Sequence, residues 1–247
     1  MNTTNPTLAL SPQSTSTAPR SFAPRPARWL GAALFVEAAL SLAPMAVLAP
    51  AIGWPASLGQ PAAEQLAAIA AQPGAVQFGY GLYLLYSVLI APLMIALAAR
   101  WAGGVHRPWG AAVAAFAALS TLARSVGILR WLTVMPVLAA THATADPATR
   151  VSIERLFDAV HLYGGGIGEV LGVSLFMALA MGALGVAMLR SPQAPRWLGA
   201  SAIVVAVLLG ALSLPVFGVL LRLPIAAAVS ALTLWMVAAG ARAMVRD

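Results

Sequence analysis

Long apolar stretches alternate with short polar segments along most of the chain. Each stretch approaches the roughly 20 residues that an α-helix needs to cross about 30 Å of hydrocarbon, at about 1.5 Å per residue. The pattern therefore predicts an all-α polytopic membrane bundle with six transmembrane helices. The predicted spans are residues 29–50, 76–99, 109–131, 167–189, 197–221 and 224–241, and the third has an apolar extension to residue 140.

Three of the predicted spans open with the same residue pattern. An arginine and a tryptophan, separated by proline in one case, come just before Gly-Ala in residues 28–32, 107–111 and 196–200. Arginine favours the water beside the negatively charged cytoplasmic leaflet, and tryptophan favours the headgroup region. The pattern therefore marks the cytoplasmic ends of these helices.

The distribution of arginine predicts that both termini are cytoplasmic. With that orientation, nine arginines fall in inner segments and three in outer segments, as the positive-inside rule requires. The inner arginines are Arg20, Arg25, Arg28, Arg100, Arg107, Arg190, Arg196, Arg242 and Arg246, and the outer ones are Arg150, Arg155 and Arg222. The tyrosines Tyr80, Tyr83, Tyr86 and Tyr163 cluster toward the outer side, where we expect an interfacial belt.

The segments outside the spans give further expectations. Residues 1–27 are rich in Ser, Thr, Pro and Ala and predict a disordered cytoplasmic tail, which leaves residues 28–247 as the six-helix transmembrane domain. The outer segment 51–75 predicts a short amphipathic helix lying on the membrane, and residues 146–162 predict a second one. The glycines at 164–166 are expected to break that helix before the fourth span.

Composition supports a membrane class and excludes several others. Hydrophobic residues make up 61% of the chain and charged residues 9%, against about 25% charged in soluble domains. The net charge is +7, but the charges lie at helix ends and form no basic face, so we expect no nucleic-acid partner. The absence of cysteine excludes disulfides and thiol catalysis. Membrane lipid is the expected partner, with another membrane protein as an alternative.

Charged residues within predicted spans are the best candidates for function, because charges are costly in hydrocarbon. Arg124 and Glu169 lie at similar depths in the outer third of the bilayer and have opposite signs. We expect an ion pair between their helices, and the alternative is a polar cavity that binds an anionic or zwitterionic ligand. Arg130 is further out and is expected to extend to the outer interface.

Three further residues are candidates for ligand or ion-pair sites. Glu37 lies about 12 Å into the first span, with no basic residue at a matching depth, so it is either a hydrogen-bonded structural carboxyl or a proton-coupling group. Asp158 and His161 share one helix face through their i, i+3 spacing. No His-Glu-x-x-His motif, Ser-His-Asp grouping or carboxylate dyad is present, so we predict no metal, cofactor or catalytic residue.

The C-terminal third resembles a bacterial membrane-protein family, the domain of unknown function 4386. The resemblance lies in residues 189–191 (Leu-Arg-Ser), residues 194–199 (Ala-Pro-Arg-Trp-Leu-Gly), Trp235 and Gly240. Further upstream, Ala123-Arg124 and His161 match an arginine and a histidine of that family. The resemblance implies a six-span helical bundle in the bacterial inner membrane, and it implies no activity.

Three classes of function remain open at this level. A binding or accessory membrane protein is favoured, because polar residues are few in the spans and catalytic groupings are absent. A small proton-coupled transporter requires Glu37, Arg124 and Glu169 to line one cavity. A membrane-embedded enzyme acting on a lipid or quinone requires Asp158, His161 and Glu169 to converge on a pocket.

Overall fold

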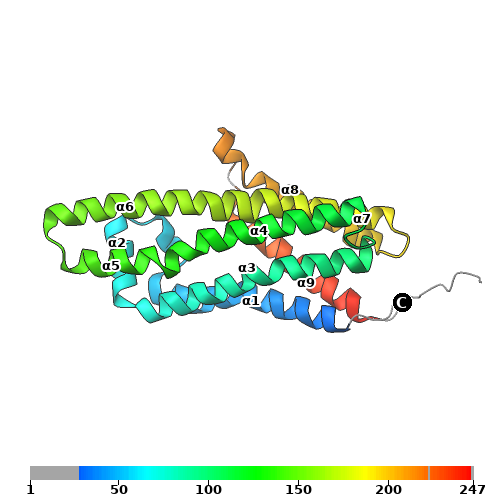
Figure 1. The fold of residues 1–247 in the computed structure, drawn as a ribbon, viewed down its shortest axis with the longest axis horizontal. Coiled ribbons are helices and arrows are strands. Elements are labelled where there is room, and N and C mark those ends of the chain that lie inside the picture. The colour runs from blue at the N-terminus through cyan, green and yellow to red at the C-terminus, as the bar shows by residue number, and fades with distance from the viewer. Residues whose placement is uncertain (1–27, 222, 246–247) are drawn as a thin grey trace, which may run out of the picture.

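A computed structural model describes residues 28–221 and 223–245, so the predicted tail at residues 1–27 lies outside the described residues. Within these residues every regular element is helical, which confirms the predicted all-α class (Figure 1). The elements are α1 (Arg28–Ile52), η1 (Ala56–Gly59), α2 (Ala62–Ala71), α3 (Pro73–Trp101), α4 (Pro108–Leu132), α5 (Val134–Thr144), α6 (Pro147–Gly165), η2 (Gly166–Phe176), α7 (Met177–Arg190), α8 (Arg196–Ala211), η3 (Leu214–Phe217) and α9 (Ile225–Met244).

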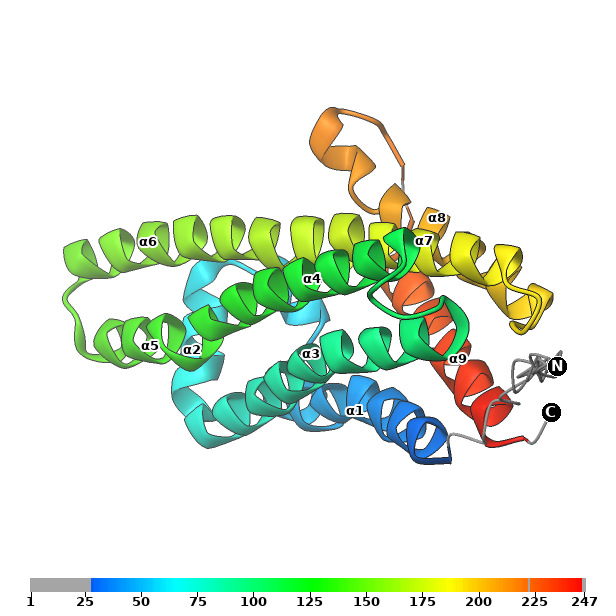
Figure 2. The ribbon, with the colours of Figure 1, turned by 45° about the vertical axis from the view of Figure 1, so that its right-hand side comes forward.

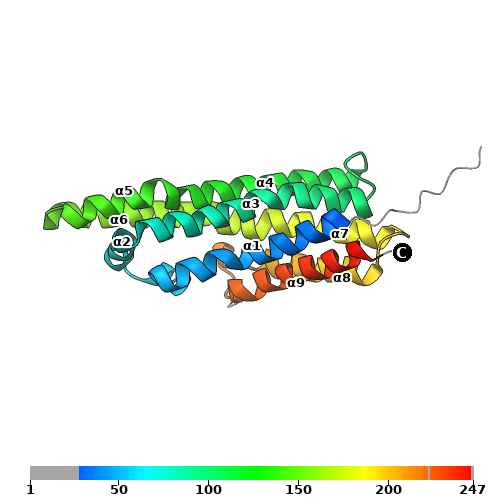
Figure 3. The same ribbon diagram turned by 90° about the horizontal axis from the view of Figure 1, so that it is seen from below.

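Six helical segments of the described chain, with η2 and α7 counted as one, pack in a ring along the long axis of the molecule. Going round, α1 packs on α3, α3 on α4, α4 on η2 and α7, α7 on α8, α8 on α9, and α9 returns to α1. Viewed from below, α1 and α9 run side by side (Figure 3). The start of α1 and the end of α9 therefore lie at the same end of the bundle, as Figure 2 shows.

In the part of the chain that the structure describes, five helical segments are long and apolar enough to cross a membrane, one fewer than the six predicted. They are Arg28–Ile52, Pro73–Trp101, Pro108–Thr144, Pro147–Arg190 and Ile225–Met244. The sixth, α8, has 16 residues and measures about 24 Å, shorter than the hydrocarbon core.

The predicted fifth span, residues 197–221, is shorter because α8 ends at Ala211. The chain then forms the 3-10 turn η3 with Pro215 in its first turn, and Gly218 follows with a φ of +79°. Proline and left-handed glycine both stop an α-helix. Trp235 on α9 holds α8 in place, because its indole Nε1 donates a hydrogen bond of 3.0 Å to the Leu198 carbonyl oxygen.

The helix break expected at residues 164–166 is wrong. One helical segment runs from Pro147 to Arg190, and residues Gly166–Phe176 widen to π-helical turns within it. Two glycines of this segment serve packing: a Cβ on Gly164 would lie 2.6 Å from the Arg130 Cδ, and a Cβ on Gly127 of α4 would lie 2.7 Å from the Cα of Gly168. The stabilisation from close packing against α4 therefore exceeds the cost of glycine in helix propensity, about 1 kcal/mol.

A hydrophobic cluster lies at the end of the molecule opposite the start of α1, where α2, α5 and α6 meet (Figure 1). The amphipathic helix predicted after residue 61 is present as α2. Its apolar residues Leu66 and Ile69 are buried in this protein cluster, so the expectation that they face a membrane is wrong.

Asp146 begins α6 as an N-cap. Its carboxylate accepts hydrogen bonds from the backbone amides of Ala148 and Thr149, at 3.0 and 3.1 Å, and from the Thr149 hydroxyl, at 2.6 Å. Because these bonds favour the charged form, first the one from the Thr149 hydroxyl, the pKa of Asp146 is lowered from its ordinary value. The cap is therefore formed above that ordinary pKa and is lost only as the pH falls through the lowered value.

The close contact between α4 and η2 yields a stability prediction. Replacing Gly127 with Ala forces the two backbones apart, and overpacking of this kind costs about 1–3 kcal/mol. We expect a lower melting temperature in detergent. The matched control is Gly81→Ala on α3, where a Cβ meets no heavy atom within 4 Å, and which we expect to leave the melting temperature equal or higher. Equal melting temperatures for the two variants would show that the contact is unimportant.

Candidate functional site

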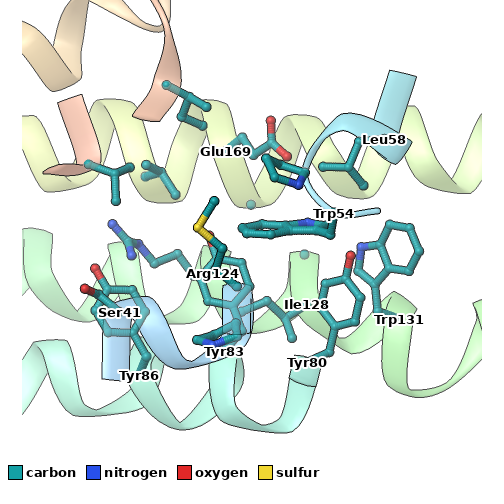
Figure 4. Close-up of a pocket in the computed structure, with 18 of the residues that line it drawn as sticks. Ser41, Trp54, Leu58, Tyr80, Tyr83, Tyr86, Arg124, Ile128, Trp131 and Glu169 are labelled. Carbon is teal, nitrogen blue, oxygen red and sulfur yellow. The ribbon is translucent and has the colours of Figure 1, made fainter. Parts of the chain in front are cut away.

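A cavity of about 240 Å³ lies where α1, α3, α4, η2 and the start of α9 converge. The segment around Trp54 and Leu58, between α1 and α2, closes one side (Figure 4). Its size is a little below the range of roughly 300–1,000 Å³ that is common for small-molecule sites. It is the candidate site because three of the charged residues singled out by sequence, Arg124, Arg130 and Glu169, line it.

Aromatic rings form one wall of the cavity. Tyr80 stacks on Trp131 with ring centroids 4.6 Å apart and an interplanar angle of 5°. Tyr83 packs against Tyr86 at 6.0 Å and meets the edge of Trp54 at 6.3 Å. These rings give a rigid, mostly apolar surface with a few polar tips, which suits an amphipathic ligand.

The tyrosines were predicted as an interfacial belt, and the structure corrects this for two of them. Tyr80 and Tyr86 are buried and line the cavity together with Tyr83, whereas Tyr163 is exposed. The sequence contains a signal for this arrangement, because the spacing of three residues between Tyr80, Tyr83 and Tyr86 places them near one face of a helix.

Arg124 is the charged side chain most fully enclosed at the cavity. It extends from α4, is 3% exposed, and its guanidinium lies 5.6 Å from the centre of the Tyr86 ring. Gly172 of η2 makes room for it, because a Cβ there would lie 2.8 Å from the Arg124 Cγ. Among the described residues, Nε and Nη2 of Arg124 have no hydrogen-bond partner.

The predicted ion pair between Arg124 and Glu169 is not formed, since no salt bridge joins these two described residues and Nε and Nη2 of Arg124 stay unpaired. Figure 4 shows the reason: Arg124 extends toward Ser41 and Tyr86, whereas Glu169 lies nearer Trp54. Similar depth on two helices does not fix the direction in which each side chain points.

The electrostatic partners of these two residues also differ from the prediction. The charge of Arg124 acts on Glu37, and the charge of Arg130 acts on Glu169. Glu169 lies on the lining of the cavity and is partly exposed.

Arg130 does not extend to the outer interface as expected. It is buried, its Nη1 donates a 2.7 Å hydrogen bond to the Gly127 carbonyl oxygen, and its guanidinium lies 5.5 Å from the Trp131 ring centre. The absence of a side chain at Gly164 opens this path, because a Cβ there would lie 2.6 Å from the Arg130 Cδ. The guanidinium of Arg130 is therefore held by a backbone carbonyl and an aromatic ring inside the protein, and it does not extend to interfacial water.

Glu37 lies apart from the main cavity, in a small pocket lined by Leu93, Met94, Met177 and other apolar residues. It is fully buried, and neither of its carboxyl oxygens has a hydrogen-bond partner among the residues described. The interpretation as a hydrogen-bonded structural carboxyl is therefore not supported by the geometry.

Asp158 and His161 are not brought to the cavity. Asp158 is exposed, and His161 stacks on Phe157 at 5.8 Å and packs edge-to-face with Trp131 at 5.6 Å. The site required for an enzyme, with Asp158, His161 and Glu169 around one pocket, is therefore not assembled here.

Comparison with known proteins places the chain in a family. A family described as "Domain of unknown function (DUF4386)" matches residues 28–240. The chain belongs to this family. The DUF4386 match extends well upstream of the C-terminal motifs that suggested it and includes every helix that lines the cavity. No curated protein and no solved structure matches the chain.

The unpartnered carboxyl of Glu37 in this DUF4386 protein yields a stability prediction. Replacing a buried polar group that has no partner with an apolar side chain of similar volume is often neutral or stabilising, by up to a few kcal/mol. We therefore expect Glu37→Met to keep or raise the melting temperature in detergent. The control is Leu34→Met in the same pocket, which we expect to be neutral or slightly destabilising. A large loss of stability for Glu37→Met alone would show that the carboxyl has a stabilising partner.

Proposed function

We propose that this protein is a multipass membrane protein that binds a small anionic or zwitterionic ligand in the cavity between α1, α3, α4, η2 and α9. The observation that carries the proposal is Arg124, a buried guanidinium at the cavity, two of whose nitrogens have no hydrogen-bond partner among the described residues. Burying a charge without a hydrogen-bonded partner is costly. A bound phosphate or carboxylate offsets that cost, because charge-assisted hydrogen bonds to arginine are among the strongest.

The remainder of the cavity suits such a ligand. The aromatic wall of Tyr80, Tyr83 and Trp131 supplies apolar contact, and most ligand sites combine such a surface with a few polar groups. Glu169 lies apart from Arg124 at the cavity margin (Figure 4). This separation of opposite charges suits a zwitterion, whose cationic end is placed near Glu169.

Binding is favoured over the two other classes by the position of the candidate residues. A proton-coupled transporter was expected to place Glu37, Arg124 and Glu169 in one cavity, but Glu37 lies in a separate small pocket. An enzyme acting on a lipid or quinone was expected to use Asp158 and His161, which do not line the cavity.

We further propose that the chain crosses the inner membrane of a bacterium six times, with both termini in the cytoplasm. The support is the arrangement of arginines, because those at helix ends meet at one end of the bundle. These are Arg28, Arg100, Arg107, Arg190, Arg196 and Arg242. In this arrangement α8, with 16 residues, is a short sixth crossing.

Ligand retention should depend on Arg124. We expect Arg124→Gln to lower retention of an anionic ligand by about tenfold or more, because hydrogen bonds to charged groups are worth about 1.5–3 kcal/mol. The measurement is native mass spectrometry of the full chain, released from gentle detergent with phosphatidylglycerol as the anionic probe.

The matched control for that variant is Arg190→Gln. Arg190 also packs against an aromatic ring, with its guanidinium 5.1 Å from the Trp109 ring centre, but it lies outside the cavity. We expect this control to retain the probe as the unmodified protein does. Equal losses for both variants would indicate general charge attraction and would contradict a site at Arg124.

The orientation is tested with reporter fusions to the full chain. A green fluorescent protein fused after Asp247 should fluoresce, because it folds in the cytoplasm. Alkaline phosphatase inserted after Ala145, between α5 and α6, should be active, and the same insertion after Gly103, between α3 and α4, should be inactive. The reversed activities would overturn the proposed orientation.

A further inference from the structure

We propose that the cavity opens sideways into the outer leaflet of the membrane, between α1 and α9, and that its ligand is a membrane lipid with an acidic headgroup. The inference rests on the proposed binding function and adds the route of access and the chemical class of ligand. The shared chemistry of the headgroup is a phosphate or carboxylate that faces Arg124.

The first argument is the exposure of apolar residues that line the cavity. Leu42 and Met45 of α1 are 61% and 47% exposed, and Ile225 at the start of α9 is 44% exposed, yet all three line the cavity. Three exposed side chains on the lining place the mouth of the cavity at the surface between α1 and α9. The opening is therefore bordered by these apolar side chains.

The second argument is the depth of this opening along α1. Leu42 lies about 21 Å from the start of the helix at Arg28, at about 1.5 Å per residue. With the start of α1 at the cytoplasmic interface, this depth falls within the outer half of about 30 Å of hydrocarbon. The opening then faces acyl chains, and a ligand that passes through it must be soluble in lipid.

The third argument is the apolar segment next to the opening. After α8 the chain projects away from the bundle before it returns to α9 (Figure 2). Its exposed residues include Val216, Phe217, Val219 and Leu220. Exposed apolar surface of this kind marks a membrane or partner contact in a folded protein. Because this segment leads to Ile225 at the start of α9, its contact with lipid lies beside the opening.

The dimensions of the cavity decide which part of the ligand it holds. A volume of about 240 Å³ is small for a drug-sized molecule and smaller still than a whole two-chain lipid. The headgroup and the first methylenes therefore occupy the cavity, with the acidic group toward Arg124. The acyl chains leave between Met45 and Ile225 and remain in the leaflet.

The test uses substitutions that narrow the opening and leave Arg124 unchanged. Ala226 is exposed on α9 and lines the cavity, so Ala226→Phe should obstruct the opening while leaving the helix folded. Its neighbour Ala227 is also exposed but does not line the cavity, and Ala227→Phe is the matched control. A second pair on α1 is Met45→Trp, at the opening, and Val36→Trp, which is exposed elsewhere on the helix.

The full chain is placed in nanodiscs that contain equal amounts of phosphatidylglycerol and phosphatidylcholine, and retained lipid is measured by native mass spectrometry. We expect phosphatidylglycerol to be retained preferentially. Ala226→Phe and Met45→Trp should lower its retention by roughly tenfold, the effect of an overpacked contact, while the two controls stay near the unmodified protein.

A parallel arm offers glycerol 3-phosphate in water, which carries the same acidic group without acyl chains. If it binds as strongly as the lipid, and the obstructing variants bind normally, the lateral opening is wrong while the anion site at Arg124 stands. If Arg124→Gln retains both probes unchanged, the proposed binding function itself fails. Loss of lipid in the obstructing variants, with weak binding of glycerol 3-phosphate to the unmodified protein, supports the inference.

Discussion

The close approach of α4 to the α6–η2 segment is the constraint on which the site depends. Gly127 faces Gly168 across this contact, where a Cβ on Gly127 would lie 2.7 Å from the Gly168 Cα and a Cβ on Gly168 would lie 3.2 Å from the Gly127 Cα. The same contact is fixed by the Ser120 hydroxyl, which donates a 2.8 Å hydrogen bond to the Gly172 carbonyl oxygen. Such backbone proximity is typical of small residues at helix interfaces within membranes.

This contact also determines where two arginines lie. Glycines at 164 and 172 leave the space that the side chains of Arg130 and Arg124 occupy, so both are held against aromatic rings and neither reaches the surface. Arg130 satisfies part of its hydrogen-bonding capacity through the Gly127 carbonyl. Arg124 has no such bond at two of its nitrogens, which is why the two residues have different roles in our proposal.

Sequence reasoning predicted the helical class, the family and most helix positions, because apolar runs and arginine–tryptophan ends are local signals. It also selected Arg124 and Glu169, since charge within an apolar run is visible in the sequence alone. It was wrong where the outcome depends on the neighbouring helix. Gly164 leaves room for the Arg130 side chain of α4, and the pairing of charges follows side-chain direction, which depth along a helix does not determine. The end of α8 was missed despite its local signals at Pro215 and Gly218.

The distribution of unpaired polar atoms separates a binding site from a structural clamp. A clamp between two helices gains its stability from a closed ion pair, so its charges contact each other. Here Arg124 and Glu169 line one cavity without doing so, and Glu37 is buried without a hydrogen bond in a separate pocket. Native proteins leave few buried polar groups unsatisfied, so each such group requires a physical explanation. An acidic ligand that pairs with the guanidinium of Arg124 offsets the free-energy cost of burying this charge beside the aromatic wall.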